Sequence, residues 1–136
     1  SVPGAIGAKL VHPEKKILAV CGDGGFMMNC QEFETALRAK TPFVTLVFND
    51  SSYGLIKWKQ MDQYGKSCCV DFTNPDFVKF AESMGAIGYR ITKAEDLVPT
   101  LKKAFEQNVP VIIDCPVDYA ENTKLTAHLK ELMEKL

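Results

Sequence analysis

Four short, largely apolar runs divide the chain and are separated by longer segments of mixed polarity. They occupy residues 17–21, 43–48, 87–91 and 109–115, each with glycine, asparagine or proline close by. Apolar runs of this length are typical of strands that are buried on both faces of a parallel sheet. The first run stops at a glycine-rich turn, which places the end of the first strand at Asp23. The sequence therefore predicts four strands.

Between these runs, apolar positions recur at helical spacing, and three of the segments begin with helix-capping patterns. We expect Asn29 and Glu32 to form a capping box, so that Glu32 is a capping residue and Glu34 lies on a solvated face. We expect Asn74 to cap a second helix. Helical spacing is found at residues 5–10, 29–40, 55–60, 74–84, 95–105 (behind a Thr92 and Glu95 capping box) and 121–136, whereas residues 64–73 are expected to form a loop.

Alternation of strands and helices favours an α/β fold, because each helix must bury its apolar stripe against the sheet. We predict a three-layer, open, mostly parallel sheet with helices on both faces. The 136 residues are enough for one domain with its own core. The last helix carries Leu125, Leu129 and Leu132 at helical spacing, and it packs either on this core or on a partner.

Composition narrows the class of protein. Hydrophobic residues make up 46% and charged residues 24%, which is ordinary for a globular protein and excludes disorder. The net charge of -1, without long runs of like charge, removes the electrostatic case for a nucleic acid or anionic membrane partner. No stretch approaches the about 20 apolar residues of a membrane span, and no signal pattern opens the chain. We expect a cytoplasmic location.

The five cysteines form no C-x-x-C pair and no zinc-like spacing. We expect reduced thiols in structural roles, since a free cysteine in an apolar run behaves as a small hydrophobic residue. They are Cys21, Cys30, Cys68, Cys69 and Cys115. Cys68 and Cys69 lie outside the apolar runs, and their role stays open.

Two acidic turns follow the first two strands. Because consecutive parallel strands end at the same edge of a sheet, we expect Asp23 and Asp50 to be neighbours in space. Two carboxylates among glycine and serine residues suit a hard dication that prefers oxygen ligands, namely Mg²⁺ or Ca²⁺ in its place. Protein-bound Mg²⁺ is usually shared with a phosphate, and Gly24 and Gly25 allow the backbone to approach phosphate oxygens. Taken singly, a Gly-Asp-Gly-Gly turn is also compatible with a plain tight turn.

The spacing of these turns resembles the motif of the thiamine diphosphate-dependent decarboxylase and carboligase superfamily, a Gly-Asp-Gly followed by an asparagine pair. That resemblance implies Mg²⁺ ligation by Asp23, Asp50 and the backbone carbonyl of Ser52. This sequence has Asp50 where most members have asparagine, which keeps an oxygen ligand and adds a charge. The cofactor contacts implied for thiamine diphosphate are Gly22, Asp23, Gly24, Gly25, Asp50, Ser52, Tyr53, Gly54 and Leu55.

The longer motifs GAIGAKL, GDGGFMMN, YGLIKWKQ and PVIIDCPVDY resemble the catabolic branch of the acetolactate synthases. This resemblance implies a parent enzyme that decarboxylates pyruvate and joins the two-carbon unit to a second pyruvate. It implies that residues 1–136 are the C-terminal, diphosphate-binding domain and a fragment of a longer three-domain chain that forms homo-oligomers. By this resemblance Leu55, Ile56 and Trp58 would lie beside the active site, although Trp58 could equally anchor the loop or the core.

The parts of the family's active site that this sequence lacks predict that the chain alone is inactive. Family members activate the cofactor with a glutamate on a separate pyrimidine-binding domain of the same or a partner subunit, and no catalytic residue is expected here. Three alternatives stay open: another thiamine diphosphate-dependent 2-keto acid decarboxylase, oxidase or carboligase; a non-catalytic nucleotide-binding α/β module; and a Mg²⁺-dependent phosphatase or phosphotransfer domain. The second is disfavoured because the sequence has no G-x-G-x-x-G motif.

Overall fold

The computed structural model describes residues 1–119 as one α/β unit. The helix expected over residues 121–136 lies outside the described residues. None of the described helices is long and apolar enough to cross a membrane. The elements are α1 Val2–Val11, β1 Leu18–Gly22, α2 Asp23–Met27, α3 Glu32–Arg38, β2 Val44–Asn49, α4 Gly54–Tyr64, α5 Phe77–Met84, β3 Ile87–Arg90, the 3₁₀ helix η1 Ala94–Asp96, α6 Leu97–Ala104 and β4 Val111–Pro116.

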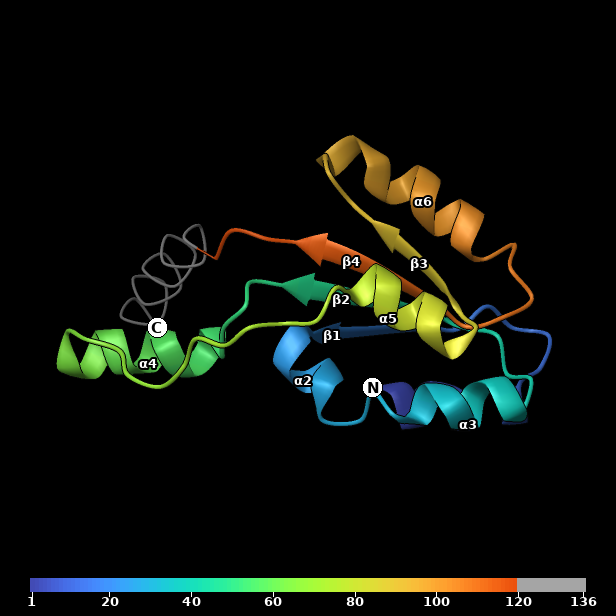
Figure 1. The fold of residues 1–136 in the computed structure, drawn as a ribbon, viewed down its shortest axis with the longest axis horizontal. Helices are drawn as coiled ribbons and strands as arrows, with labels where there is room; N and C mark the ends of the chain where they lie inside the picture. Colours follow the sequence, from blue (N-terminus) through green and yellow to red (C-terminus); the bar gives the residue numbers. More distant parts are fainter. Residues whose placement is uncertain (120–136) are drawn as a thin grey trace, which may run out of the picture.

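The described strands form one parallel sheet in the order β1-β2-β4-β3. Figure 1 shows α6 on one side of this sheet and α1, α2 and α3 on the other, so the predicted three-layer arrangement is confirmed. All four predicted strands are present, each within two residues of its expected bounds. Because β1 and β2 are hydrogen-bonded neighbours, with Gly22 opposite Phe48, the turns that follow them meet at one edge.

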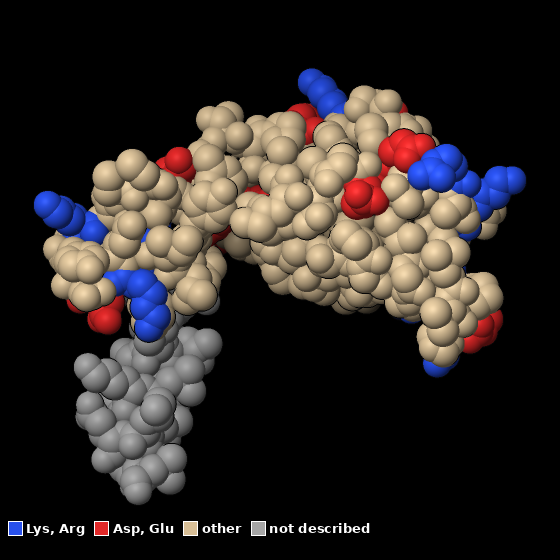
Figure 2. All heavy atoms as spheres, turned by 90° about the horizontal axis from the view of Figure 1, so that it is seen from below, with Lys and Arg blue, Asp and Glu red and all other residues tan. Residues whose placement is uncertain are grey.

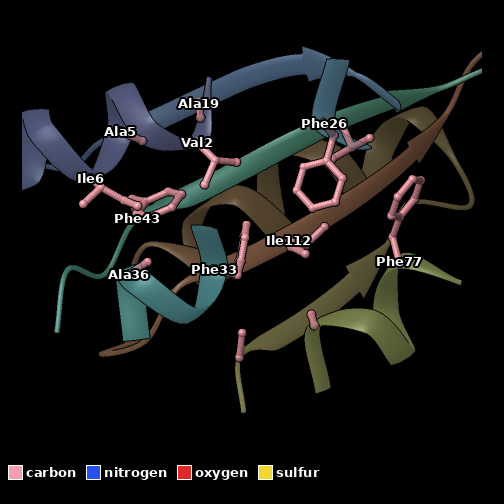
Figure 3. Packing of buried hydrophobic residues seen from close by; sticks show 13 residues of the cluster. Val2, Ala5, Ile6, Ala19, Phe26, Phe33, Ala36, Phe43, Phe77 and Ile112 are labelled. Carbon is pink, nitrogen blue, oxygen red and sulfur yellow. The ribbon is translucent and has the colours of Figure 1, made fainter. Parts of the chain in front are cut away.

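The larger core lies between the sheet and the helices α1, α2, α3 and α5. Phe26 of α2 is its centre, packing edge-on against Phe33 of α3 and against Phe77 of α5 with ring centroids 5.8 Å and 5.3 Å apart (Figure 3). Edge-to-face aromatic pairs of this kind add to the stabilisation from buried area. The packing fixes α2, and therefore the turn after β1, against the rest of the domain.

The opposite face of the sheet is covered over β3 and β4 by α6. Ala104 of α6 packs with Val111 and Ile113 of β4 in a second apolar cluster. On the β1 side of the same face, Leu18 and Val20 remain 42% and 50% exposed. In Figure 2, acidic and basic side chains lie scattered around the rim of one face of the molecule rather than in a patch of one sign. This distribution agrees with the balanced net charge.

Three predicted helix caps are wrong in the structure. The N-cap of α3 is Gln31 without a side-chain hydrogen bond, so Asn29 and Glu32 form no capping box. The region after β1, expected to be a turn leading into that helix, is instead the five-residue helix α2. Asn29 begins no helix because Phe26, whose carbonyl accepts from the Asn29 amide, is held in the core and closes α2 just before it.

The other two caps move for similar reasons. Asp76, rather than Asn74, caps α5 by accepting from the amides of Val78 and Lys79. Thr92 donates to the Asp96 carboxylate at 3.1 Å, and the cap position before η1 is Lys93. The side chains of Asn74 and Thr92 thus form hydrogen bonds outside the local capping pattern. The partners of Asn74 lie at the candidate site.

Candidate functional site

A cavity of about 400 Å³ opens at the carboxyl edge of the sheet, where β1 and β2 end. The first turns of α2 and α4 form two of its sides, and α4 extends beyond the strand ends (Figure 1). It gathers all nine residues that the sequence indicated as cofactor contacts. The cavity is lined by Gly22, Asp23, Gly24, Gly25, Phe48, Asp50, Ser52, Tyr53, Gly54, Leu55, Ile56, Val117 and Tyr119.

Asp23 is the first residue of α2 and is only 2% exposed. Its Oδ1 accepts from the Gly24 amide at 2.8 Å. Its Oδ2 accepts from the Ser51 amide at 2.8 Å and from the Asn74 Nδ2 at 2.6 Å. A buried carboxylate requires such donors because its charge has been taken out of water. Asp23 therefore ties the turn after β1 to the turn after β2.

Asp50 follows β2 and lies within electrostatic range of Asp23. Burial, and then the Asp23 charge, raise the pKa of the Asp50 carboxyl, against an opposing hydrogen bond from the Ser52 amide to its Oδ1 at 3.3 Å. Two carboxylates that repel one another across a cavity favour a cation between them. Within residues 1–119 no group of three or more His, Cys, Asp or Glu side chains is arranged to hold a metal ion. A cation here needs further oxygens from the backbone, water or a ligand.

The backbone after Asp50 is shaped by a left-handed residue. Ser51 has φ of 54°, a conformation that is uncommon outside glycine. The strip from Ser51 to Tyr53 is held by residues 70–72: the Tyr53 amide donates to the Val70 carbonyl at 2.8 Å and the Phe72 amide to the Ser51 carbonyl at 3.1 Å. Ser52, whose carbonyl was expected to face a metal, is buried in this strip.

Three glycines at the cavity differ in what surrounds them. A Cβ on Gly24 would lie 2.7 Å from Tyr53 Cε1, and one on Gly54 would lie 2.8 Å from Asp50 Oδ2. A Cβ on Gly25 would meet nothing within 4 Å, although Gly25 lines the cavity. The Gly25 backbone is therefore open to the close approach of a ligand. At Gly24 and Gly54, in contrast, the absence of a Cβ leaves room for the Tyr53 and Asp50 side chains.

Several lining or supporting residues were not expected from the sequence. Phe48, Val117 and Tyr119 line the cavity, and Asn49 and Asn74 form hydrogen bonds at its edge. Phe48 is the last apolar residue of its run, so its place at a strand end was a usable signal. Asn74 lies in the loop before α5, far along the chain, and no local pattern connects it to Asp23.

Trp58 and the cysteines have no part in lining this cavity. Trp58 lies on α4, with the Lys59 ammonium 4.4 Å from its ring centroid. All five cysteines are free, and Cys115 is buried. Burial raises the pKa of the Cys21 and Cys115 thiols, which favours their unreactive form. Cys68 and Cys69 are exposed, with their sulfurs 3.3 Å apart.

Comparison with known proteins identifies relatives over most of the chain. The family model for the C-terminal TPP-binding domain of thiamine pyrophosphate enzymes matches residues 1–115. An acetolactate synthase of Bacillus subtilis is 45% identical over 127 residues, 93% of this chain and 22% of the relative. A catabolic acetolactate synthase of Raoultella terrigena is 36% identical over 98% of this chain and 24% of the relative. A probable acetolactate synthase large subunit of Methanococcus aeolicus is 37% identical, over 85% and 20% respectively. The chain thus spans less than a quarter of the length of these relatives.

Proposed function

The chain belongs to the C-terminal TPP-binding domain family of thiamine pyrophosphate enzymes. From this premise we propose that it binds Mg²⁺ and the diphosphate of thiamine diphosphate within an acetolactate synthase-like enzyme. Thiamine diphosphate and thiamine pyrophosphate are the same molecule. Asp23, Asp50 and the Ser52 carbonyl supply the metal ligands. The other contacts come from the backbone around Gly22, Gly24, Gly25, Tyr53, Gly54 and Leu55.

One observation carries this proposal: Asp23 and Asp50 leave neighbouring parallel strands and lie within electrostatic range of each other at one cavity. Burial first, and then the Asp23 charge, raise the pKa of Asp50, and a bound dication would offset both effects. The open space beside Gly25 fits a ligand that comes close to the backbone. A diphosphate would add the phosphate oxygens that Mg²⁺ usually shares with protein carboxylates.

Bound thiamine diphosphate would supply the carbanion-stabilising chemistry of the reaction. The residues of this chain bind and orient it: the two carboxylates fix the position of the metal, and the Gly25 backbone admits the diphosphate. Leu55 and Ile56 form an apolar wall at the mouth of the cavity. Such a wall would exclude water once it is covered by another domain.

We place the residue that activates the cofactor on another domain of the same or a partner subunit. The described residues that line the cavity include no histidine or glutamate. Helix α4 has no buried residue, and Leu55, Ile56, Met61 and Tyr64 are between 47% and 65% exposed on it. A projecting helix with exposed apolar side chains beside a cavity is suited to contact with a further domain or a second subunit.

For the whole enzyme we propose pyruvate as the substrate and acetolactate with CO₂ as the products. The relatives that are named acetolactate synthases support this assignment over other members of the same superfamily. Products formed from pyruvate by the full-length protein distinguish acetolactate from acetaldehyde or acetyl derivatives. The cytoplasmic location and the homo-oligomer stay predictions.

The binding proposal is tested by thermal melting of the chain with thiamine diphosphate, with and without Mg²⁺. A ligand at about 100 times its dissociation constant adds about 2.7 kcal/mol to the free energy of unfolding, a shift of several degrees. We expect a rise that requires both metal and cofactor and that disappears in Asp23→Ala and in Asp50→Ala.

Asp62→Ala is the matched control, because Asp62 is an exposed carboxylate on α4 that does not line the cavity. It should leave the ligand-induced rise unchanged. A rise that survives Asp23→Ala would contradict the assigned site. If this chain shows no rise, the same titration on the full-length protein decides between a wrong site and one completed by another domain.

A further inference from the structure

The side chain of Asn74 joins the carboxyl ends of β1 and β2, although Asn74 itself lies in a loop outside the sheet. Its Nδ2 donates to Asp23 Oδ2 at 2.6 Å and to Asn49 Oδ1 at 3.0 Å. Asn74 lies between α4 and α5, and it caps neither helix. The same nitrogen lies 3.5 Å from Ser51 Oγ, and its two shorter bonds connect Asp23, the first residue of α2, to the last residue of β2.

The orientation of this amide is set by its neighbours. A carboxylate only accepts hydrogen bonds, so the Asp114 Oδ1 that lies 2.9 Å from Asn49 must face its Nδ2. The Asn49 Oδ1 then faces Asn74, so the Asn74 side chain must present a donor to it. The Asp23 carboxylate also requires a donor from Asn74. Flipping either amide would place two oxygens against each other.

The chain of hydrogen bonds continues to the far edge of the sheet. Arg90, the last residue of β3, donates from Nε to Asp114 Oδ2 at 2.9 Å. Asp114 is 1% exposed, and its bond holds the pKa of the Arg90 guanidinium above its ordinary value. Hydrogen bonds thus join residues of β2, β4 and β3 to one another, and Asn74 connects this group to Asp23, directly after β1. Such buried bonds restrain the groups that they join. The Oδ1 of Asn74 takes no part in the network, because it is buried and has no hydrogen-bond partner within residues 1–119.

The hydrogen bonds of Asp23 limit how its carboxylate could bind a cation. A carboxylate has about four lone-pair directions, two on each oxygen. Both directions on Oδ2 are used, by the Ser51 amide and by Asn74, and one direction on Oδ1 is used by the Gly24 amide. One direction on Oδ1 is left, so a cation would be ligated by this oxygen alone.

We propose that Asn74 is a positioning residue for the cation site, which fixes the Asp23 carboxylate so that Oδ1 is presented to the metal. The inference rests on the proposed function, because it assigns Asn74 a role toward the same Mg²⁺ site. Partners of metal ligands typically contribute 10- to 100-fold to metal affinity. Loss of the Asn74 amide is expected to weaken cation binding by about tenfold or more.

The experiment uses the full-length protein freed of metal, at a fixed concentration of thiamine diphosphate, with Mn²⁺ as the probe. The electron paramagnetic resonance signal of free Mn²⁺ gives its dissociation constant without any assay of activity. Asn74→Ala removes the side chain, and Asn74→Leu keeps its approximate volume while removing the donor. We expect both variants to bind Mn²⁺ at least about tenfold more weakly than the unsubstituted protein.

Asp76→Ala is the matched control for a purely structural effect. It removes the side-chain cap of α5 two residues further on and one carboxylate contact of Arg90, but leaves the bonds from Asn74 to Asp23 and from Arg90 to Asp114. We expect Asp76→Ala to lower the melting temperature and leave Mn²⁺ affinity unchanged. Equal affinity in Asn74→Leu and the unsubstituted protein, or an equal loss in Asp76→Ala, would overturn the inference. Absence of Mn²⁺ binding in the unsubstituted protein would instead overturn the proposed function, and the inference with it.

Discussion

Ser51 connects the turn after β2 to the Asp23 carboxylate through its backbone amide. Its left-handed conformation turns its amide toward Asp23 Oδ2 while its neighbours Asp50 and Ser52 face the cavity. A non-glycine residue in this region stores strain of about 1–3 kcal/mol, which the surrounding contacts must offset. The hydrogen bonds between this strip and residues 70–72 provide that restraint. Nothing in the letters Asn-Asp-Ser-Ser indicates which of the four takes this conformation.

Asp50 should make the metal-free chain less stable at neutral pH. Its pKa is raised above the ordinary 3.8, chiefly by burial and then by Asp23, so the folded state holds the proton more tightly than the unfolded state. Stability contributed by the protonated form is therefore lost as the pH rises from about 3.8 through the raised pKa. We expect Asp50→Asn to raise the metal-free melting temperature at about pH 7. Because asparagine keeps an oxygen, the response to Mg²⁺ should weaken without disappearing.

The measurement is a series of metal-free melts across this pH range, with Asp62→Asn as the control for removing an exposed charge. The stabilisation by Asp50→Asn should shrink toward zero as the pH falls to the ordinary pKa of an aspartate. Identical melting temperatures for Asp50→Asn and the unsubstituted chain at every pH would refute the assigned coupling.

Helix α5 shows how elements depend on both local caps and distant contacts. Asp76 caps it, and the guanidinium of Arg90 reaches the same carboxylate at 3.1 Å. Proline at position 75 made Asn74 the expected cap, yet the start of a helix is open to any acceptor that precedes its free amides. In the structure Asp76 caps the helix, and the Asn74 side chain instead binds Asp23 at the candidate site.

Gly88 permits α5 to lie directly on β3. A Cβ on Gly88 would lie 2.5 Å from Val78 Cα and 2.8 Å from its carbonyl oxygen, which are backbone atoms that cannot rotate away. We expect Gly88→Ala to push α5 off the sheet and lower the free energy of unfolding by about 1–3 kcal/mol or more. Because α5 follows Asn74, the response to Mg²⁺ should fall as well.

Gly7 provides the matched control, since it lies inside α1 and a Cβ there would meet nothing within 4 Å. Alanine in a helix interior is favoured over glycine by about 0.5–1 kcal/mol, so Gly7→Ala should raise the melting temperature. Denaturant unfolding of the two variants measures both changes. A stability loss as large in Gly7→Ala as in Gly88→Ala would show that the close approach of α5 is not the cause.

On the scale of the whole molecule, the sheet order β1-β2-β4-β3 gathers the polar ends of all four described strands at one edge. Helix α4 projects from this same edge without a buried residue, while Leu18 and Val20 stay exposed on the opposite side of β1 from the main core. The described part of the chain therefore presents apolar surface on α4, beside the site, and along one face of β1. This pattern supports the proposal that another domain or subunit covers the site.

We expect the 136-residue chain to turn over no pyruvate, even with saturating thiamine diphosphate and Mg²⁺. The described lining of its cavity offers no histidine or glutamate as a general base, and without a base beside the cofactor its reactive carbon is not deprotonated efficiently. A sensitive assay for CO₂ release from pyruvate, run beside the full-length protein, measures this. Measurable turnover by the chain alone would place a catalytic residue within it.

The sequence by itself determined the α/β class, the four strands and the meeting of Asp23 with Asp50, because these follow from local apolar periodicity and from the parallel direction of consecutive strands. Tertiary structure alone decided the helix caps, the left-handed Ser51 and the place of Asn74. Such features depend on competition between partners that are distant in the chain. The local sequence predicts a cap at Asn74 because an acceptor before a helix is visible there, whereas Asp23 lies 51 residues away and becomes its partner only when the sheet has assembled.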